Sequence, residues 1–210
     1  MTRLFRSFPL VLKISSTLQM LLGLVLLIIG LSISHAENLL KSETIIAHFE
    51  EKQSSTRNFN ENITVTIFAD GYVKVYRPSY YKKSGIFSGH LDPVALNQLW
   101  NQLTSPSLLN FNETEIQHRL KTAKNQQEKN TLLLQRVSDA PTIIIEIYPN
   151  RYMPTASIDQ NNWNTTKRIT WYALQWTAEN FPELEELHEL MEVRELFENI
   201  LESSELKSLN

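Results

Sequence analysis

The chain has 210 residues, of which 42% are hydrophobic, and its 20 basic and 23 acidic side chains give a formal charge of −3. This length and composition suit one globular domain with a sizeable core and exclude a low-complexity or collagen-like chain. The absence of cysteine excludes disulfides, thiolate metal sites and cysteine nucleophiles, and five glycines leave little material for a phosphate-binding loop.

The first 36 residues have the features of a secretory signal peptide. A segment with basic and no acidic side chains (1–13) precedes an almost wholly apolar run (18–33). Small residues, Ser34 and Ala36, then stand at the positions that a signal peptidase requires for cleavage after Ala36. The alternative is an uncleaved anchor, although the run is shorter than the ~20 residues that span a bilayer. Both interpretations predict that Glu37 and the residues after it are exported.

Export and charge restrict the compartment and the partners. Removal of residues 1–36 takes away three basic residues and no acid, so the net charge falls from −3 to −6. This charge argues against nucleic acid as a partner. An exported domain without cysteine is more typical of bacteria than of small disulfide-rich eukaryotic proteins. We therefore expect one periplasmic or secreted domain over 37–210, in contact with the membrane only if the N-terminal segment is retained.

Residues 63–77 predict a β-hairpin, because two alternating runs flank the turn residues 69–71. A three-residue loop places Val65 opposite Val75 and keeps every aliphatic side chain on one face, whereas a two-residue loop would mix the faces. We therefore predict a type I turn with Gly71 in the left-handed region, in a bulge. The opposite face of the hairpin then carries polar and aromatic side chains, namely Thr64, Thr66, Phe68, Tyr72, Lys74 and Tyr76.

The remaining elements follow from hydrophobic periodicity. Besides the hairpin, the predicted strands are 44–50, 84–91, 131–137, 142–148 and 167–172. The predicted helices are 93–103, with Asp92 as N-cap and Pro93 in its first turn, an exposed one over 112–129, and a long C-terminal one over 182–206. This order predicts an α+β fold, with an antiparallel sheet of about five or six strands covered on one face by helices.

Motifs for catalysis are absent from the sequence. There is no phosphate-binding loop, no dinucleotide-binding fingerprint and no nucleophile elbow. His48, His90 and His118 are scattered, with no spacing that would bring two of them together. We therefore predict no catalytic residue and no cofactor, and favour a protein that is not an enzyme. The alternative is a hydrolase whose histidine or carboxylate groups are brought together only by the fold.

His188 and Glu192 are the weak candidates for a metal site. They share one helix face at i, i+4 spacing, in a His-Glu-x-x-Glu run that resembles the H-E-x-x-H motif but ends in glutamate. A solvated acidic helix face explains the same pattern, so no metal site is assigned. A metal or small-ligand carrier is the second alternative function.

One aromatic and basic cluster lies in and directly after the hairpin. Its members are Tyr72, Lys74, Tyr76, Arg77, Tyr80, Tyr81, Lys82 and Lys83. Tyrosine supplies rigid contact area with a hydroxyl group, and the basic side chains supply charge. The leading hypothesis is therefore a non-catalytic domain of the cell envelope that binds a protein or an envelope polymer. The alternative explanation is an ordinary solvated sheet face with cross-strand Tyr–Lys pairs.

Two stretches of the sequence resemble uncharacterised exported proteins of proteobacteria. The first is the run 63–75 with its Asp70-Gly71 turn, followed by Gly85, Gly89 and a helix start at Asp92-Pro93. The second extends from Ser138 through the tryptophans of 171–176 to Pro182. The resemblance is a loose pattern over most of 60–200. It implies export and gives no activity and no functional residue. Asp92-Pro93 stands where the pattern usually has a Ser or Thr cap.

Overall fold

The computed structural model describes residues 43–54, 61–128, 139–152 and 162–209. The chain divides into two units, 1–40 and Lys41–Asn210, and the described residues all belong to the second, which is compact. The predicted signal peptide over 1–36 and the predicted strand over 131–137 therefore lie outside the described residues.

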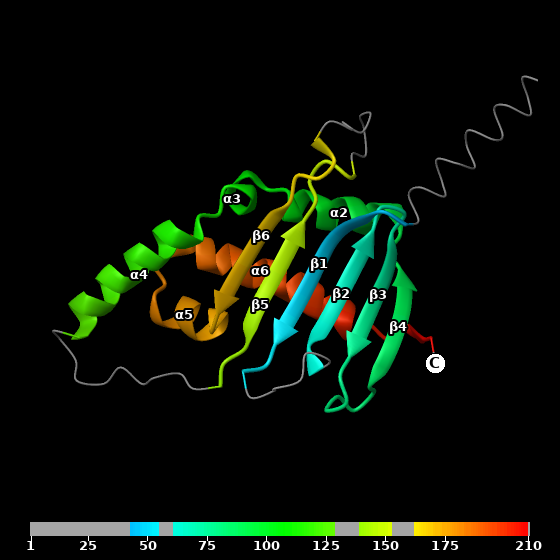
Figure 1. Cartoon of the computed structure of the whole chain (residues 1–210), viewed down its shortest axis with the longest axis horizontal. Helices are drawn as coiled ribbons and strands as arrows, with labels where there is room; N and C mark the ends of the chain where they lie inside the picture. The colour runs from blue at the N-terminus through cyan, green and yellow to red at the C-terminus, as the bar shows by residue number, and fades with distance from the viewer. Residues whose placement is uncertain (1–42, 55–60, 129–138, 153–161, 210) are drawn as a thin grey trace, which may run out of the picture. The chain divides into compact units, whose positions relative to one another are not determined.

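The second unit is built on one antiparallel sheet of seven strands (Figure 1). In chain order these are β1 (Ile45–Lys52), β2 (Ile63–Phe68), β3 (Tyr72–Arg77), β4 (Gly85–His90), β5 (Thr142–Ile147), β6 (Lys167–Tyr172) and β7 (Lys207–Ser208). Their order across the sheet is β6-β5-β1-β2-β3-β4-β7. The predicted α+β fold is confirmed, with slightly more strands than expected because the chain ends in the unpredicted strand β7.

The hairpin of β2 and β3 has the register that the sequence predicts. Val65 pairs with Val75, and Thr66 pairs with Lys74. The Gly71 N–H donates to the Phe68 carbonyl over 3.0 Å, and Gly71 has a φ of 90°, which side chains rarely adopt. A Cβ at this position would also lie 2.6 Å from a backbone carbonyl oxygen. The turn therefore needs glycine. The length of this turn fixes the register of the hairpin, and the register determines which side chains of β2 and β3 share a face.

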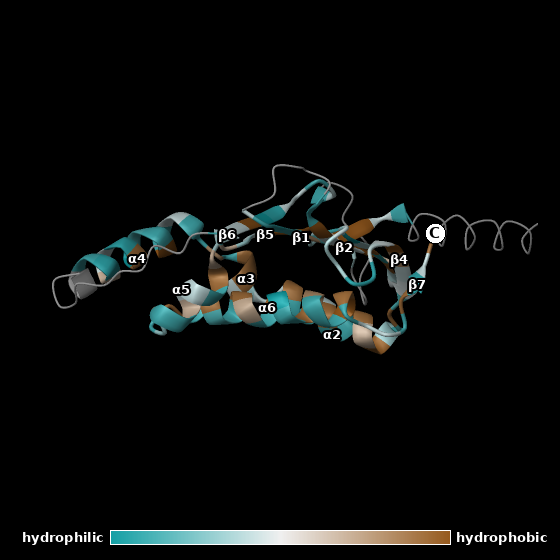
Figure 2. Ribbon diagram, turned by 90° about the horizontal axis from the view of Figure 1, so that it is seen from below, coloured by the Kyte–Doolittle hydropathy of each residue, from teal (hydrophilic) through white to brown (hydrophobic). Residues whose placement is uncertain are grey.

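Helices cover one face of the sheet (Figure 2). They are α2 (Pro93–Leu103), α3 (Pro106–Leu109), α4 (Glu113–Glu128), α5 (Leu174–Asn180) and α6 (Glu185–Leu201). Figure 2 shows α2, α3, α5 and α6 in one layer against the sheet, while α4 extends beyond the edge formed by β6. The Asp92 carboxylate accepts from the N–H groups of Val94 (2.8 Å) and Ala95 (2.9 Å), as its predicted N-cap role requires. Helices α3 and α5 were not predicted.

The core lies between the covered face of the sheet and α6. Phe49 of β1 stacks on Phe197 of α6 with ring centroids 4.9 Å apart. Trp171 of β6 meets the edge of Phe111 at 6.0 Å. Burial of each such side chain contributes about 1.5–3 kcal/mol, so the helix layer holds these strands in one fixed arrangement.

The C-terminal helix is shorter than predicted. The sequence favours a helix over 182–206, but α6 ends at Leu201, where the guanidinium of Arg77 donates to the Leu201 carbonyl. This bond satisfies one of the carbonyls that a helix end leaves unpaired. The chain then turns, and Leu206 packs onto Gly89, where an added Cβ would lie 2.9 Å from the leucine side chain. Leu206 thus covers the sheet edge next to β7 and does not continue the helix.

Candidate functional site

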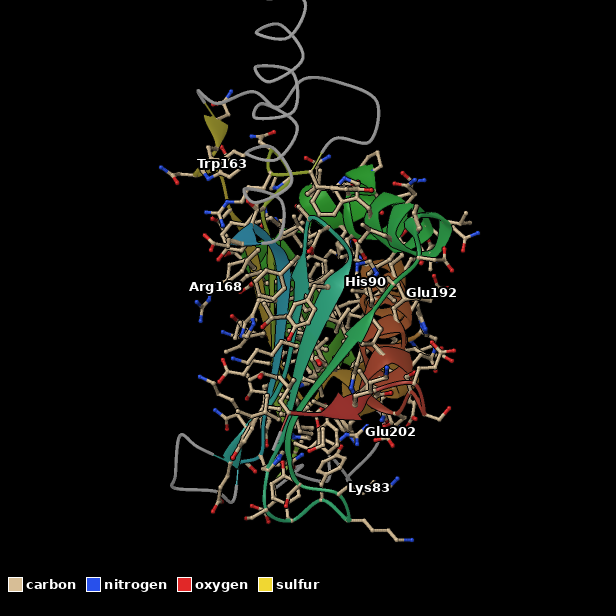
Figure 3. The ribbon with its side chains drawn as sticks, turned by 90° about the vertical axis from the view of Figure 1, so that its right-hand side faces the viewer. Lys83, His90, Trp163, Arg168, Glu192 and Glu202 are labelled. Carbon is tan, nitrogen blue, oxygen red and sulfur yellow. The ribbon has the colours of Figure 1, made fainter. Side chains whose placement is uncertain are left out.

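The face of the sheet opposite the helices is open in the described part of the chain (Figure 2). Strand residues alternate between the two faces, so the pairing registers assign the side chains of this open face. They are His48, Glu50 and Lys52 of β1, Thr64, Thr66 and Phe68 of β2, Tyr72, Lys74 and Tyr76 of β3, Ile86, Ser88 and His90 of β4, Thr142, Ile144 and Glu146 of β5, and Arg168, Thr170 and Tyr172 of β6. Figure 3 shows Arg168 projecting on this side, away from α6.

A row of polar side chains crosses the middle of the open face. The pairing registers place these residues side by side on successive strands, in the order Arg168, Glu146, His48, Thr66, Lys74 and Ser88. Directly opposed residues on neighbouring strands have Cβ atoms about 4.5–5.5 Å apart. Glu146 is therefore within reach of Arg168, whereas Lys74 is separated from Glu146 by His48 and Thr66 on the two strands between them.

The half of the open face on β1, β5 and β6 contains its own counterions. The Glu146 carboxylate lies 2.6 Å from the Arg168 guanidinium. The Glu50 carboxylate lies 3.6 Å from the Lys52 ammonium and accepts a hydrogen bond of 2.7 Å from the Asn62 amide. Both carboxylates of this half are thus neutralised locally, and a ligand meets little net charge there.

The half on β2, β3 and β4 has a positive charge and no acid. These three strands contain no Asp or Glu. Lys74 is exposed and forms no ion pair with any described residue. Phe68 and Tyr72 pack against each other with ring centroids 5.5 Å apart. We name this region the β2–β4 patch, which consists of Thr64, Thr66, Phe68, Tyr72, Lys74, Tyr76 and Ser88.

The structure divides the aromatic and basic cluster predicted from the sequence. Tyr72, Lys74 and Tyr76 share the open face, as predicted. Arg77 does not belong with them, because the alternation of the strand turns it to the covered face, where only 7% of it is exposed. There its guanidinium lies 4.5 Å from the centroid of the Phe87 ring and donates to the end of α6. Arg77 thus joins sheet and helix and cannot contact a ligand on the open face.

The other four residues of the cluster form the Tyr80–Lys83 loop between β3 and β4. Tyr80 is 48% exposed, and its ring lies 5.6 Å from that of Tyr81, which is half-buried. Burial, with smaller contributions from Tyr81 and Glu51, raises the pKa of Tyr80 to about 12. Its hydroxyl therefore stays a hydrogen-bond donor. Lys82 and Lys83 are exposed, and Figure 3 shows Lys83 extending away from the protein.

His48 lies at the centre of the open face and is the residue to examine for catalysis. Its Nδ1 lies 3.0 Å from the Thr66 Oγ1, and its partner on the other neighbouring strand is Glu146. Hydroxyl, imidazole and carboxylate in this order are the components of a nucleophilic triad. However, the Glu146 carboxylate already accepts from Arg168 (2.6 Å) and from the Tyr148 hydroxyl (3.3 Å). Burial lowers the pKa of His48, against the opposing effect of Glu146 and Glu50.

Three hollows formed by described residues lie away from His48. The largest, of about 460 Å³, lies between α3, α4 and α6 and is lined by five glutamates, one of which, Glu186, is bound by Arg119. That hydrogen-bonded pair lowers the pKa of Glu186. The other two, of about 210 and 200 Å³, lie beside Trp176 and beside Leu206. None of these three hollows is lined by His48 or Glu146.

The weak metal candidates His188 and Glu192 are both exposed on α6. Figure 3 shows Glu192 on the helix side of the molecule, away from the open face. Among the described residues, no group of three or more His, Cys, Asp or Glu side chains is arranged to hold a metal ion. The i, i+4 pair thus has no third ligand within that part of the chain, and a lone pair of side chains makes a poor site.

Comparison with family models, with curated proteins and with solved structures gives no match to this chain. The resemblance to exported proteobacterial proteins therefore stays a prediction. Within the described ranges, no helix is long and apolar enough to cross a membrane. A function for this protein has to be inferred from the residues of the open face.

Proposed function

We propose that this protein is an exported, non-catalytic binding domain of the bacterial cell envelope, and that the β2–β4 patch is its binding surface. The observation that carries the proposal is the uneven open face. One half contains paired charges, while the other presents Tyr72, Tyr76 and the unpaired Lys74 on rigid strands. The N-terminal sequence, with its basic start, apolar run and Ser34-His35-Ala36 exit, supports export.

The rigidity of the patch suits a binding surface. Strands β2 and β3 each pair with a neighbouring strand on both sides. The side chains of Val65 and Val75, which point to the covered face of the sheet, are fully buried. Tyr72 and Tyr76 are half-buried, so their rings are already ordered before a ligand arrives. Association costs side-chain entropy at an interface, and preordered tyrosines reduce that cost. Less of the binding free energy is therefore lost to the ordering of these two side chains.

Binding is tested by recovering the partner from envelope extract on the immobilised domain. The test variant is Tyr72→Thr/Lys74→Gln/Tyr76→Thr, since threonine is well tolerated in strands. The matched control is Tyr172→Thr/Lys121→Gln, which changes an exposed tyrosine on β6 and an exposed lysine on α4. We expect the test variant to lose the bound material and the control to retain it. Equal recovery on both would remove the patch from the proposal.

Export is tested separately by N-terminal sequencing of the protein recovered from the envelope. A chain that begins at Glu37 would agree with cleavage after Ala36. A chain that retains residues 1–36 and fractionates with the membrane would support the anchor. Recovery in the cytoplasm with an intact N-terminus would contradict the export half of the proposal, whatever the patch binds.

A further inference from the structure

The chemistry of the β2–β4 patch points to the class of ligand, and this inference rests on the function proposed above. We propose that the ligand is a hydrated linear polyanion, an envelope polymer with regularly spaced carboxylate or phosphate groups, that runs along β3 toward the Tyr80–Lys83 loop. The charges, the lack of exposed large hydrophobic side chains, the position of the three hollows away from the patch and the position of the loop each support this assignment.

The local charges of the patch and the loop favour an anionic ligand, whereas the net charge of −6 opposes one. Lys74 on the patch and Lys82 and Lys83 on the loop are exposed and form no ion pair with any described residue. On the other half of the face, Glu50 and Glu146 already have cationic partners. An anionic chain is attracted by the free lysines and gains nothing on the side of the paired carboxylates. It is therefore expected to follow β3 and not to cross the sheet. Near the loop this attraction has to exceed the repulsion from Glu51 and Glu61, which lie close enough to Tyr80 to raise its pKa.

The shortage of exposed apolar area favours a hydrated polymer over a protein. The large hydrophobic side chains that are exposed in the described part of the chain are Tyr80, Val94, Tyr172 and Leu209. None of the four stands on β2, β3 or β4. The cores of protein interfaces are enriched in buried apolar and aromatic groups and depleted in lysine. Apart from Phe68, which packs on Tyr72, the patch consists of threonines, a serine, tyrosines and a lysine. These side chains can donate hydrogen bonds to ligand oxygens that remain partly hydrated.

None of the three hollows noted above is lined by a residue of the β2–β4 patch, which favours a long ligand over a small one. Small molecules bind in recesses that enclose most of their surface. Tyr72, Lys74 and Tyr76 occupy alternate positions on β3, so they follow one another at about 7 Å. A repeating polymer can contact each of these donors in turn, and it needs no cavity because the contacts add along its length.

The position of the loop extends the same track. β3 ends at Arg77, and the chain leads directly into the Tyr80–Lys83 loop at that end of the sheet (Figure 1). The loop lysines therefore lie beyond the end of β3, and Figure 3 shows Lys83 extending on the side of Glu202, so a polymer that contacts both Lys74 and Lys83 has to pass around this end of the sheet. A compact anion could reach only one of these two regions. A polymer can contact both the β2–β4 patch and the Tyr80–Lys83 loop.

The inference is tested with defined polymers on the full exported domain. Polygalacturonate carries carboxylates, polyphosphate carries phosphates, and dextran is a neutral control. Binding is measured by isothermal titration at low and at physiological salt. We expect at least one of the charged polymers to bind and dextran not to bind. The charged polymer that binds more tightly identifies the preferred anionic group.

A charge-matched pair of variants locates the binding. In Lys74→Gln/Lys83→Gln we expect the affinity at low salt to fall about tenfold or more, and the slope of log affinity on log salt to fall by about two, one per lost contact. The control Lys121→Gln/Lys124→Gln removes equal charge from α4 and should keep both values. Equal losses in the two variants would overturn the inference, because only net charge would then matter.

Polymer titration and recovery from envelope extract together separate failure of the polyanion inference from failure of the proposed binding function. If no charged polymer binds, while Tyr72→Thr/Lys74→Gln/Tyr76→Thr still loses its partner from envelope extract, the ligand is of another class, such as a protein. The polyanion inference then fails and the binding function stands. If neither experiment depends on the patch, both fail together.

Discussion

Replacement of Arg194 by methionine should be one of the most damaging single changes outside the aromatic core. Arg194 of α6 reaches the carboxylate of Glu51 on β1, with nitrogen–oxygen distances of 3.1 and 3.3 Å. Only 7% of Glu51 is exposed, on the covered side of the sheet. Arg194→Met keeps much of the side-chain volume but leaves that carboxylate buried without its cation.

The expected loss follows from that burial. Breaking a buried ion pair by removing one partner costs about 3–5 kcal/mol. The Gln53 amide still donates to Glu51 over 3.0 Å, so we expect a value near the lower limit, about 3 kcal/mol. For a domain of this size such a loss lowers the melting temperature by about 6–12 °C. The double variant Glu51→Met/Arg194→Met removes both charges and should recover most of the loss, because apolar replacements of a buried pair are often neutral.

Urea unfolding followed by tryptophan fluorescence measures the effect for wild type, both single variants and the double variant. Glu198→Gln is the control, since Glu198 also lies near Arg194, at 2.8 Å, but its side chain is 42% exposed. An exposed pair contributes about 0.2–1 kcal/mol. If Arg194→Met costs no more than this control, or if the effects of the two methionine substitutions simply add, the reasoning is refuted.

Three further predictions concern the open face and the sheet edge. Burial lowers the pKa of His48 below 6.5, so the folded state resists protonation of its imidazole. The free energy of unfolding should therefore fall as the pH drops below 6.5. Urea titrations at successive pH values should show a smaller loss in His48→Gln. Gly71→Ala should cost about 1–3 kcal/mol, because Gly71 has a φ of 90°; an unchanged urea midpoint would contradict the turn geometry. Gly89→Ala should displace Leu206 and speed hydrogen exchange of the Leu209 amide, which donates to Ile86 over 2.9 Å; unaltered exchange would show that β7 is held independently of that contact.

Local patterns in the sequence predict the hairpin and its register correctly. Placing Val65 opposite Val75 depends only on a turn and on keeping aliphatic residues together. The N-cap at Asp92 is equally local, since its carboxylate bonds to the next residues of the chain. The end of α6 is not local. At this end Leu201 accepts a hydrogen bond from Arg77, which lies 124 positions away in the sequence.

The composition of the open face could be predicted only in part. Tyr72, Lys74 and Tyr76 follow from the hairpin. The neighbours His48, Glu146 and Arg168 do not, because β1 pairs with both β2 and β5, and that pairing brings together residues about a hundred positions apart. Alternation in the segments 44–50, 142–148 and 167–172 indicates which residues share a face of each strand. It does not indicate which strands are neighbours.

The exclusion of Arg77 illustrates the same limit at short range. The sequence groups it with Tyr76 because the two are adjacent, but adjacent strand residues point to opposite faces. Applied one residue further, the alternation used for the hairpin would have placed Arg77 with Val73 and Val75 on the covered side. A buried arginine was unexpected because an unpaired charge is costly there. The carbonyl of Leu201 and the ring of Phe87 supply partners for its guanidinium, while its Nε is buried without a hydrogen-bond partner among the described residues.

The most direct test of the binding surface is photocrosslinking in intact cells of the native host. A benzophenone amino acid replaces Tyr72 or Tyr76 in separate strains, and replaces Tyr172 on the far strand β6 as the control position. The reagent inserts into nearby C–H bonds, so it reports a protein or a polymer alike. We expect illumination to give a slower-migrating adduct from positions 72 and 76 and none from position 172. Adducts of equal yield at all three positions, or none at 72 and 76, would contradict the assignment of the β2–β4 patch as the binding surface.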